Sequence, residues 1–153
     1  MKKLSSIILC LVMMFSLVSG SLTAYAASNT ITTSVSKLEA KALGFKVTYA
    51  KKSKIKGYQI QYSPSSKFDK ASAYTKTKTI TDATKTSATI TKLNGCNVKY
   101  YVRVRTYKVA NDKRVYSSWS EVKSVKTLNH KYSAATCTKA KVCKYCNLTS
   151  GKN

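Results

Sequence analysis

The chain has 153 residues, of which 28 are Lys or Arg and only 5 are Asp or Glu, so its formal net charge is +23. One histidine and a few scattered acidic residues do not readily form a catalytic triad or a carboxylate pair. The composition therefore argues against an enzyme and favours attraction to polyanions. The alternative is that the lysines only shield strand edges and keep the protein soluble.

Residues 1–26 have the features of a secretory signal peptide. Lys2 and Lys3 precede an apolar stretch at 4–18, and Ala24 and Ala26 fit the small-residue cleavage pattern. The apolar stretch is short for a membrane span, although a retained N-terminal anchor is the alternative. We expect cleavage after Ala26 and a secreted, extracellular product that associates with the cell wall and has no transmembrane anchor.

A linker at 27–30 leads into a region at 31–128 that is rich in strand patterns. Polar residues at 28–36 run into a first edge strand, and apolar residues then alternate with polar ones in several short segments. The further strands are expected at 43–50, 57–62, 74–80, 86–93, 99–109 and 116–126, with a hairpin turn at 111–113. This spacing, without a helical period, predicts an all-β fold: a seven-stranded antiparallel sandwich of the immunoglobulin type.

The phase of the alternation predicts which side chains lie between the sheets. Large apolar or aromatic residues share the inward phase on three of the strands, and each tyrosine hydroxyl can reach the edge of the core. The predicted core and corner residues are Tyr49, Tyr58, Ile60, Tyr100, Val102 and Val104.

The outward phase of the strand at 99–109 carries Arg103 and Arg105. Trp119 follows beyond the turn, where a hairpin partner can bring its indole over both guanidinium groups in a cation–π ladder. We interpret this ladder as a structural brace, with direct ligand contact as the alternative.

Three tyrosines near this strand are also expected to point outward: Tyr101, Tyr107 and Tyr116. Exposed tyrosines among lysines and arginines could form a face that contacts sugars or polyanions. Cross-strand pairing is the simpler interpretation of the same residues.

The segment at 129–153 has too few apolar residues for a core of its own, but it contains a Cys3His set. His130, Cys137, Cys143 and Cys146 include a C-x-x-C pair, and zinc prefers four tetrahedral thiolate or imidazole ligands. A disulfide between Cys137 and either Cys143 or Cys146 is the rival hypothesis in an oxidising compartment, and a disordered remnant is the third. Cys96, in a turn at 94–97, is expected to be a buried or half-buried free thiol.

The region from about 30 to 128 resembles a fibronectin type III domain. The resemblance depends on Tyr49 in the second strand, the Gly-Tyr-Gln-Ile-Gln-Tyr-Ser segment at 57–63, the pair Leu93 and Tyr100, and the Tyr-Ser-Ser-Trp-Ser segment at 116–120. It implies a tyrosine corner, in which the Tyr100 hydroxyl bonds back to the preceding loop. The Lys- and Tyr-rich composition is similar to that of versions in surface proteins of Gram-positive gut bacteria.

The segment at 130–146 resembles a short Cys/His repeat of such surface proteins, in which Gly usually stands where this chain has Asn147. Together these resemblances imply a non-enzymatic secreted or wall-associated binding or spacer module. Its expected partner is an anionic cell-wall polymer, a glycan or a protein, without specific nucleic-acid recognition. Two alternatives are a truncated accessory module of a larger secreted enzyme and a zinc-organised protein-interaction module.

Overall fold

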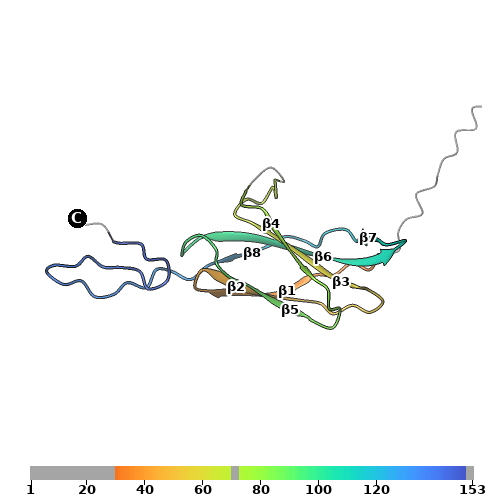
Figure 1. Cartoon of the computed structure of the whole chain (residues 1–153), viewed down its shortest axis with the longest axis horizontal. Helices are drawn as coiled ribbons and strands as arrows, with labels where there is room; N and C mark the ends of the chain where they lie inside the picture. Colours follow the sequence, from red (N-terminus) through yellow and green to blue (C-terminus); the bar gives the residue numbers. More distant parts are fainter. Residues whose placement is uncertain (1–29, 70–72, 151–153) are drawn as a thin grey trace, which may run out of the picture.

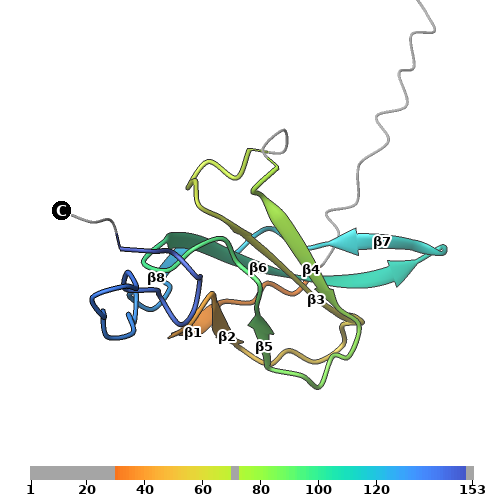
Figure 2. The same ribbon diagram turned by 60° about the vertical axis from the view of Figure 1, so that its left-hand side comes forward.

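The structure, a computed structural model, describes residues 30–69 and 73–150 and is an antiparallel β-sandwich with no helix among them (Figure 1). The predicted signal peptide lies outside the described residues. The described part of the tail extends from one end of the sandwich in both views (Figures 1 and 2).

Two sheets form the sandwich, which confirms the predicted fold class. The first has the order β1-β2-β5, and the second has the order β4-β3-β6-β7, with β8 also paired to β6. The first sheet comprises β1 (Val35–Lys41), β2 (Gly44–Tyr49) and β5 (Ser87–Ile90). The second comprises β3 (Gly57–Ser63), β4 (Lys76–Ile80), β6 (Lys99–Ala110), β7 (Lys113–Tyr116) and β8 (Lys123–Lys126).

The last strand, predicted at 116–126, is not continuous: β7 ends at Tyr116 and β8 begins at Lys123. At the break, the hydroxyl oxygens of Ser117 and Ser120 accept hydrogen bonds from the backbone N–H groups of Thr106 and Val104, both at 3.0 Å. These hydroxyls take the place of strand carbonyls, so the edge remains attached to β6 although its backbone leaves the regular ladder. The preceding hairpin turns at Asn111 and Asp112, whose φ angles of 49° and 56° suit a two-residue turn.

The polar run at 28–36 leads into β1, which begins at Val35 and forms an edge of the first sheet. In β1 only Val35 is buried, while Lys37 and Glu39 are exposed and form an ion pair at 2.8 Å. Because little of this strand is buried, its sequence lacks the alternation by which the other strands are recognised.

The core lies between the sheets and includes the side chains of Tyr49, Tyr58, Ile60, Tyr100, Val102 and Val104, as predicted.

Tyr107 was expected to be an exposed tyrosine, but its side chain is buried and only 1 % of it is exposed, so that expectation is wrong. Its register partner is Gly57, and a Cβ on that glycine would come within 2.9 Å of the Tyr107 hydroxyl. The missing side chain therefore lets the tyrosine ring lie against the sheet and become covered.

Two core tyrosines whose ring centroids are 4.5 Å apart differ in hydrogen bonding, and this difference predicts opposite effects of removing their hydroxyls. Tyr58 Oη accepts a hydrogen bond from the Lys52 N–H at 2.9 Å, whereas Tyr49 Oη is buried without a partner among the described residues. Burial raises the pKa of Tyr49 to about 12. We expect Tyr49→Phe to increase the free energy of unfolding by about 1 kcal/mol and Tyr58→Phe to decrease it by about 1 kcal/mol. Urea unfolding measures both, and equal losses in the two variants would contradict the prediction.

Candidate metal centre

Cys96 lies in the turn that leads into β6, and hydrogen bonds to the end of β8 fix this turn. The N–H of Asn97 donates to the carbonyl of Leu128 at 2.9 Å. The Thr127 hydroxyl accepts from the N–H of Val98 at 3.0 Å and donates to the carbonyl of Gly95 at 3.2 Å. The turn therefore holds Cys96, 5 % exposed, beside the point where the tail begins.

The tail folds back on itself through a small set of backbone hydrogen bonds. The N–H of Lys144 donates to Lys131 at 2.8 Å and the N–H of Cys143 donates to Leu148 at 2.8 Å. Asn147, directly after the C-x-x-C turn, has a φ of 58°, a left-handed conformation that Asn tolerates better than most residues other than Gly. The bond between Lys144 and Lys131 brings the C-x-x-C turn next to His130.

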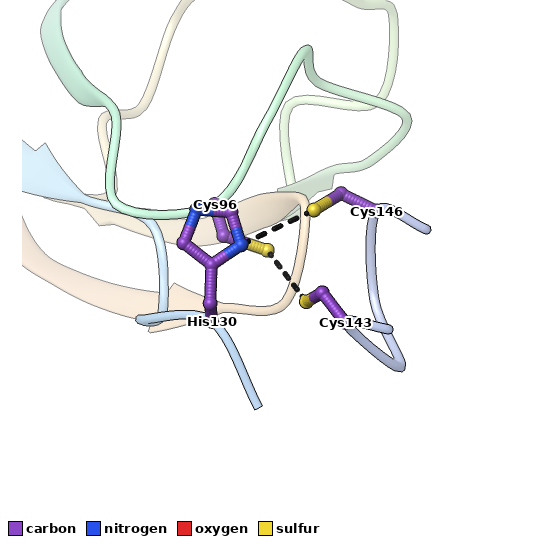
Figure 3. Close-up of side chains that lie close together, drawn as sticks. All are labelled: Cys96, His130, Cys143 and Cys146. Carbon is purple, nitrogen blue, oxygen red and sulfur yellow. Dashed lines mark hydrogen bonds between the residues drawn. The ribbon is translucent and has the colours of Figure 1, made fainter. Parts of the chain in front are cut away.

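The ligand atoms of Cys96, His130, Cys143 and Cys146 all lie within 4.8 Å of one another (Figure 3). The Cys96 and Cys143 sulfurs are 3.9 Å apart, and Cys146 Sγ is 3.3 Å from His130 Nδ1. In a tetrahedral zinc site with Zn–S bonds of about 2.3 Å, neighbouring sulfurs are about 3.8 Å apart. The four residues are therefore close enough to bind one metal ion, and the sulfurs are well beyond the S–S bond length of about 2.05 Å.

The surroundings of Cys143 favour a thiolate. Desolvation acts against the charged form, but backbone N–H groups of Tyr145 and Cys146 and the His130 ring outweigh it and hold the pKa of Cys143 below its usual value. The Tyr145 N–H lies 3.4 Å from Cys143 Sγ. For Cys96, desolvation and the neighbouring thiols of Cys146 and Cys143 raise the pKa. A cation bound between the sulfurs would stabilise the Cys96 thiolate and so counteract both the desolvation and the neighbouring thiols.

The structure brings together three of the four metal ligands predicted from the sequence. Cys137 is exposed and lies outside the group, and Cys96 occupies the fourth position. The tail alone suggested a self-contained Cys3His set, because its four candidates are close in sequence. Only the pairing of β6 with β8 shows that the turn before β6 lies next to the start of the tail.

The arginine ladder is longer than the three residues proposed for it. The Arg103 guanidinium lies 4.2 Å from the Phe68 ring and 4.7 Å from the Trp119 ring. Arg105 lies 4.1 Å from Trp119 and 3.9 Å from Tyr116. Two aromatic residues thus extend the ladder at its ends, and desolvation lowers the pKa of both arginines.

Glutamines on the neighbouring strand orient both guanidinium groups. Arg103 donates to Gln61 Oε1 through Nε and Nη2 at 2.9 and 2.6 Å, and Arg105 Nε donates to Gln59 Oε1 at 2.8 Å. These side chains have the outward phase of β3, so the contacts cross from β3 to β6. Because both guanidinium groups lie against the Trp119 ring and each also donates to a glutamine, the ladder has the contacts of a structural brace.

The remaining candidate residues have mixed environments. The Tyr100 hydroxyl interacts with the backbone of Asn94, as the tyrosine-corner resemblance implies. Tyr101 and Tyr116 are half-buried, with Lys99 over the Tyr101 ring at 5.1 Å and the Tyr107 and Tyr116 rings 5.9 Å apart. The outward tyrosines therefore pair with neighbours on the sheet.

No helix in the described part of the chain is long and apolar enough to cross a membrane.

Comparisons with known proteins find similarity in structure but not in sequence. No protein-family model matches the chain, and no curated protein matches it. The third fibronectin III domain of human KIAA0343 protein matches with a TM-score of 0.47 and 15% identity, covering 67% of this chain and 87% of that domain. The fn3 domain of human collagen alpha-1(XX) chain matches with a TM-score of 0.48 and 16% identity, covering 74% and 98%.

A third match, to a structure described as that of a myokine, has a TM-score of 0.48 and 17% identity and covers 65% of this chain and 98% of the other. These are likenesses of chain folding alone. The class of the protein, an all-β antiparallel sandwich with a Cys/His cluster near its C-terminal end, depends on the strand pairing and the cluster described above.

Removing the indole should weaken the sandwich, because Trp119 contacts both arginines. We expect Trp119→Ala to lower the free energy of unfolding by about 2–3 kcal/mol, through two lost cation–π contacts and the lost apolar burial. Val122→Ala, at a neighbouring side chain that is 44% exposed, is the control and should change it by less than about 0.5 kcal/mol. Chemical denaturation compares the two, and similar small effects would show that the ladder does not brace the sheet.

Proposed function

We propose that this protein is a non-enzymatic, secreted binding or spacer module whose C-terminal tail is fixed to the sandwich by one structural zinc ion. The observation that carries the proposal is the convergence of Cys96 from the sandwich with His130, Cys143 and Cys146 from the tail. A donor set of three sulfurs and one imidazole nitrogen suits zinc, and four protein ligands leave no open coordination position. The zinc ion would therefore be structural rather than catalytic.

The chemistry of the cluster also supports a non-enzymatic protein. His130 is the only histidine in the chain, and its Nδ1 faces Cys146 within the cluster. No second histidine is left to act as the base in a serine or cysteine triad elsewhere. We therefore propose that the rigid sandwich presents its loops and one sheet face to a binding partner.

The basic composition supports an anionic partner. The chain carries 28 Lys or Arg residues, and its lysines lie along most strands and turns, so a negatively charged cell-wall polymer or glycan would meet attractive charge over much of the surface. The features of residues 1–26 favour export to the compartment in which such polymers occur. Attraction of this kind is distributed and does not require base-specific contacts, so we propose no specific nucleic-acid recognition.

The zinc proposal predicts that Cys96 and Cys137 differ in their effect on metal content. Cys96→Ser and Cys143→Ser should lose stoichiometric zinc, because each removes one of four ligands, whereas Cys137→Ser should keep one zinc per chain. Elemental analysis of protein purified with added zinc measures this, and thiolate-to-cobalt absorption of the cobalt form checks the ligands. Loss of zinc in Cys137→Ser but not in Cys96→Ser would overturn the assignment, as would a Cys96–Cys143 disulfide in metal-treated protein.

Zinc removal should release the tail while leaving the sandwich folded, because the core cluster contains no residue of the tail. After chelation we expect faster hydrogen exchange at the Cys143 and Lys144 amides, whose bonds to Leu148 and Lys131 shape the tail. The amides of β3 and β6 should keep their protection. Global loss of protection after chelation would contradict this division.

Electrostatic binding predicts a strong dependence on salt. Retention on an immobilised wall polymer that carries phosphate or carboxylate groups should fall sharply as the ionic strength rises from about 0.1 to 1 M, because the Debye length shrinks from about 10 to 3 Å. A neutral dextran matrix is the control and should not retain the protein at either salt concentration. Retention that is independent of salt would contradict an electrostatic mechanism.

A further inference from the structure

A cavity of about 250 Å³ lies where the two sheets part at one end of the sandwich. Tyr62 of β3, the first residue of β4 and Tyr100 of β6 contribute from the larger sheet, and the connection from β5 to β6 contributes from the other side. The residues that matter for its chemistry are Tyr62, Tyr74, Lys76, Lys92, Asn94 and Tyr100. This volume is below the roughly 300–1,000 Å³ of pockets for drug-sized ligands, so it suits a single ring.

The charged residues that line the cavity are all positive. Both charged residues, Lys76 and Lys92, are cationic, and none of the five acidic residues of the chain lines the cavity. A ligand that carries a carboxylate would therefore meet two ammonium groups without an opposing carboxylate from the protein. Charge-assisted hydrogen bonds of this type are about twice as strong as neutral ones.

Three tyrosines also line the cavity, and their properties suit a polyhydroxylated ring. Tyr100 is buried and Tyr62 is half-buried, and desolvation raises the pKa of each, so their hydroxyls remain neutral donors and acceptors. Tyr74 is 60% exposed at the rim. Three phenol groups and the amide of Asn94 can hydrogen-bond to sugar hydroxyls, while the aromatic faces cover the apolar C–H groups of the ring.

The backbone at the cavity is held in an unusual conformation. Lys92 has a φ of 58°, in the left-handed region that costs energy for a residue of this type. The next residue is fixed to the opposite strand connection, because the Leu93 N–H donates to the Leu43 carbonyl at 3.0 Å. A strained lysine on a fixed loop at the mouth of a cavity is typical of a preorganised binding position.

We propose that this cavity binds one acidic sugar residue of a glycan, with Lys76 and Lys92 at the carboxylate and the tyrosines around the ring. The inference rests on the proposed function as a binding module and is independent of the zinc proposal. It assigns to the cavity a preference for a uronic acid over a neutral sugar of the same hydroxyl pattern.

Titration with the trisaccharide of galacturonic acid, followed by amide chemical shifts of the full chain, tests the proposal. The trisaccharide of galactose is the neutral counterpart and should bind more than about tenfold more weakly, because the charge-assisted contacts of both lysines are lost. Shifts should be largest at 91–94 and around Tyr62 and Lys76. Equal affinity for both trisaccharides, or shifts spread over the whole surface, would overturn the proposal.

Variants separate the cavity from the general positive charge. Lys92→Asn removes the charge while keeping a residue that accepts positive φ, and it should weaken binding of the galacturonate about tenfold. Tyr74→Ala should also weaken binding, because it removes one of the three phenol groups from the cavity, and urea unfolding of the variant measures its effect on stability. Lys113→Gln removes the same charge from the exposed β6–β7 hairpin and should leave the affinity unchanged.

Two outcomes would overturn the cavity assignment while leaving the proposed function intact. If Lys92→Asn and Lys113→Gln lost the same affinity for the galacturonate trisaccharide, the binding would depend only on general charge attraction. Equal binding of a glycerol phosphate oligomer at 91–94 would indicate an anion site with no preference for a sugar ring. Failure of the wild-type chain to be retained on any anionic polymer would contradict the proposed function itself.

Discussion

The pairing of β6 on both of its sides is the constraint on which the rest of the structure depends. One edge of β6 pairs with β3, and the other pairs with β7 and β8 in succession. The candidate metal ligand Cys96 stands in the turn before this strand, Tyr100 near its start lines the cavity, and Arg103 and Arg105 on its outer face form the ladder. A single strand thus places the three features that carry the functional argument.

Local sequence was sufficient for the core and for most strands. Tyr100, Val102 and Val104 alternate with polar residues, and this period of two directly gives the buried face of a strand. Tyr107 breaks the same rule, because its burial depends on the absence of a side chain at Gly57 on another strand. The division of the last strand likewise depends on serine hydroxyls that bond across to β6, and composition alone does not reveal such contacts.

The metal centre was only partly predictable for a related reason. His130, Cys143 and Cys146 are close in sequence and include a C-x-x-C turn, so a local pattern identifies them. Cys96 is positioned by hydrogen bonds that join Thr127 to Gly95 and Asn97 to Leu128, which depend on the pairing of β6 with β8. Cys137 is nearer in sequence, but the tail carries it to the surface.

The origin of the ligands in two segments has a consequence for where the module ends. The strand pattern stops near Leu128, which would ordinarily mark a boundary between an independent sandwich and a dispensable extension. A chain shortened at Leu128 would lose three of the four ligands and uncover the thiol of Cys96, now 5 % exposed, at the end of the sandwich. Because Cys143 of the tail lies against Cys96, such a fragment would be more open to disulfide-linked dimerisation in an oxidising compartment, and the tail would protect this thiol as well as bind the metal.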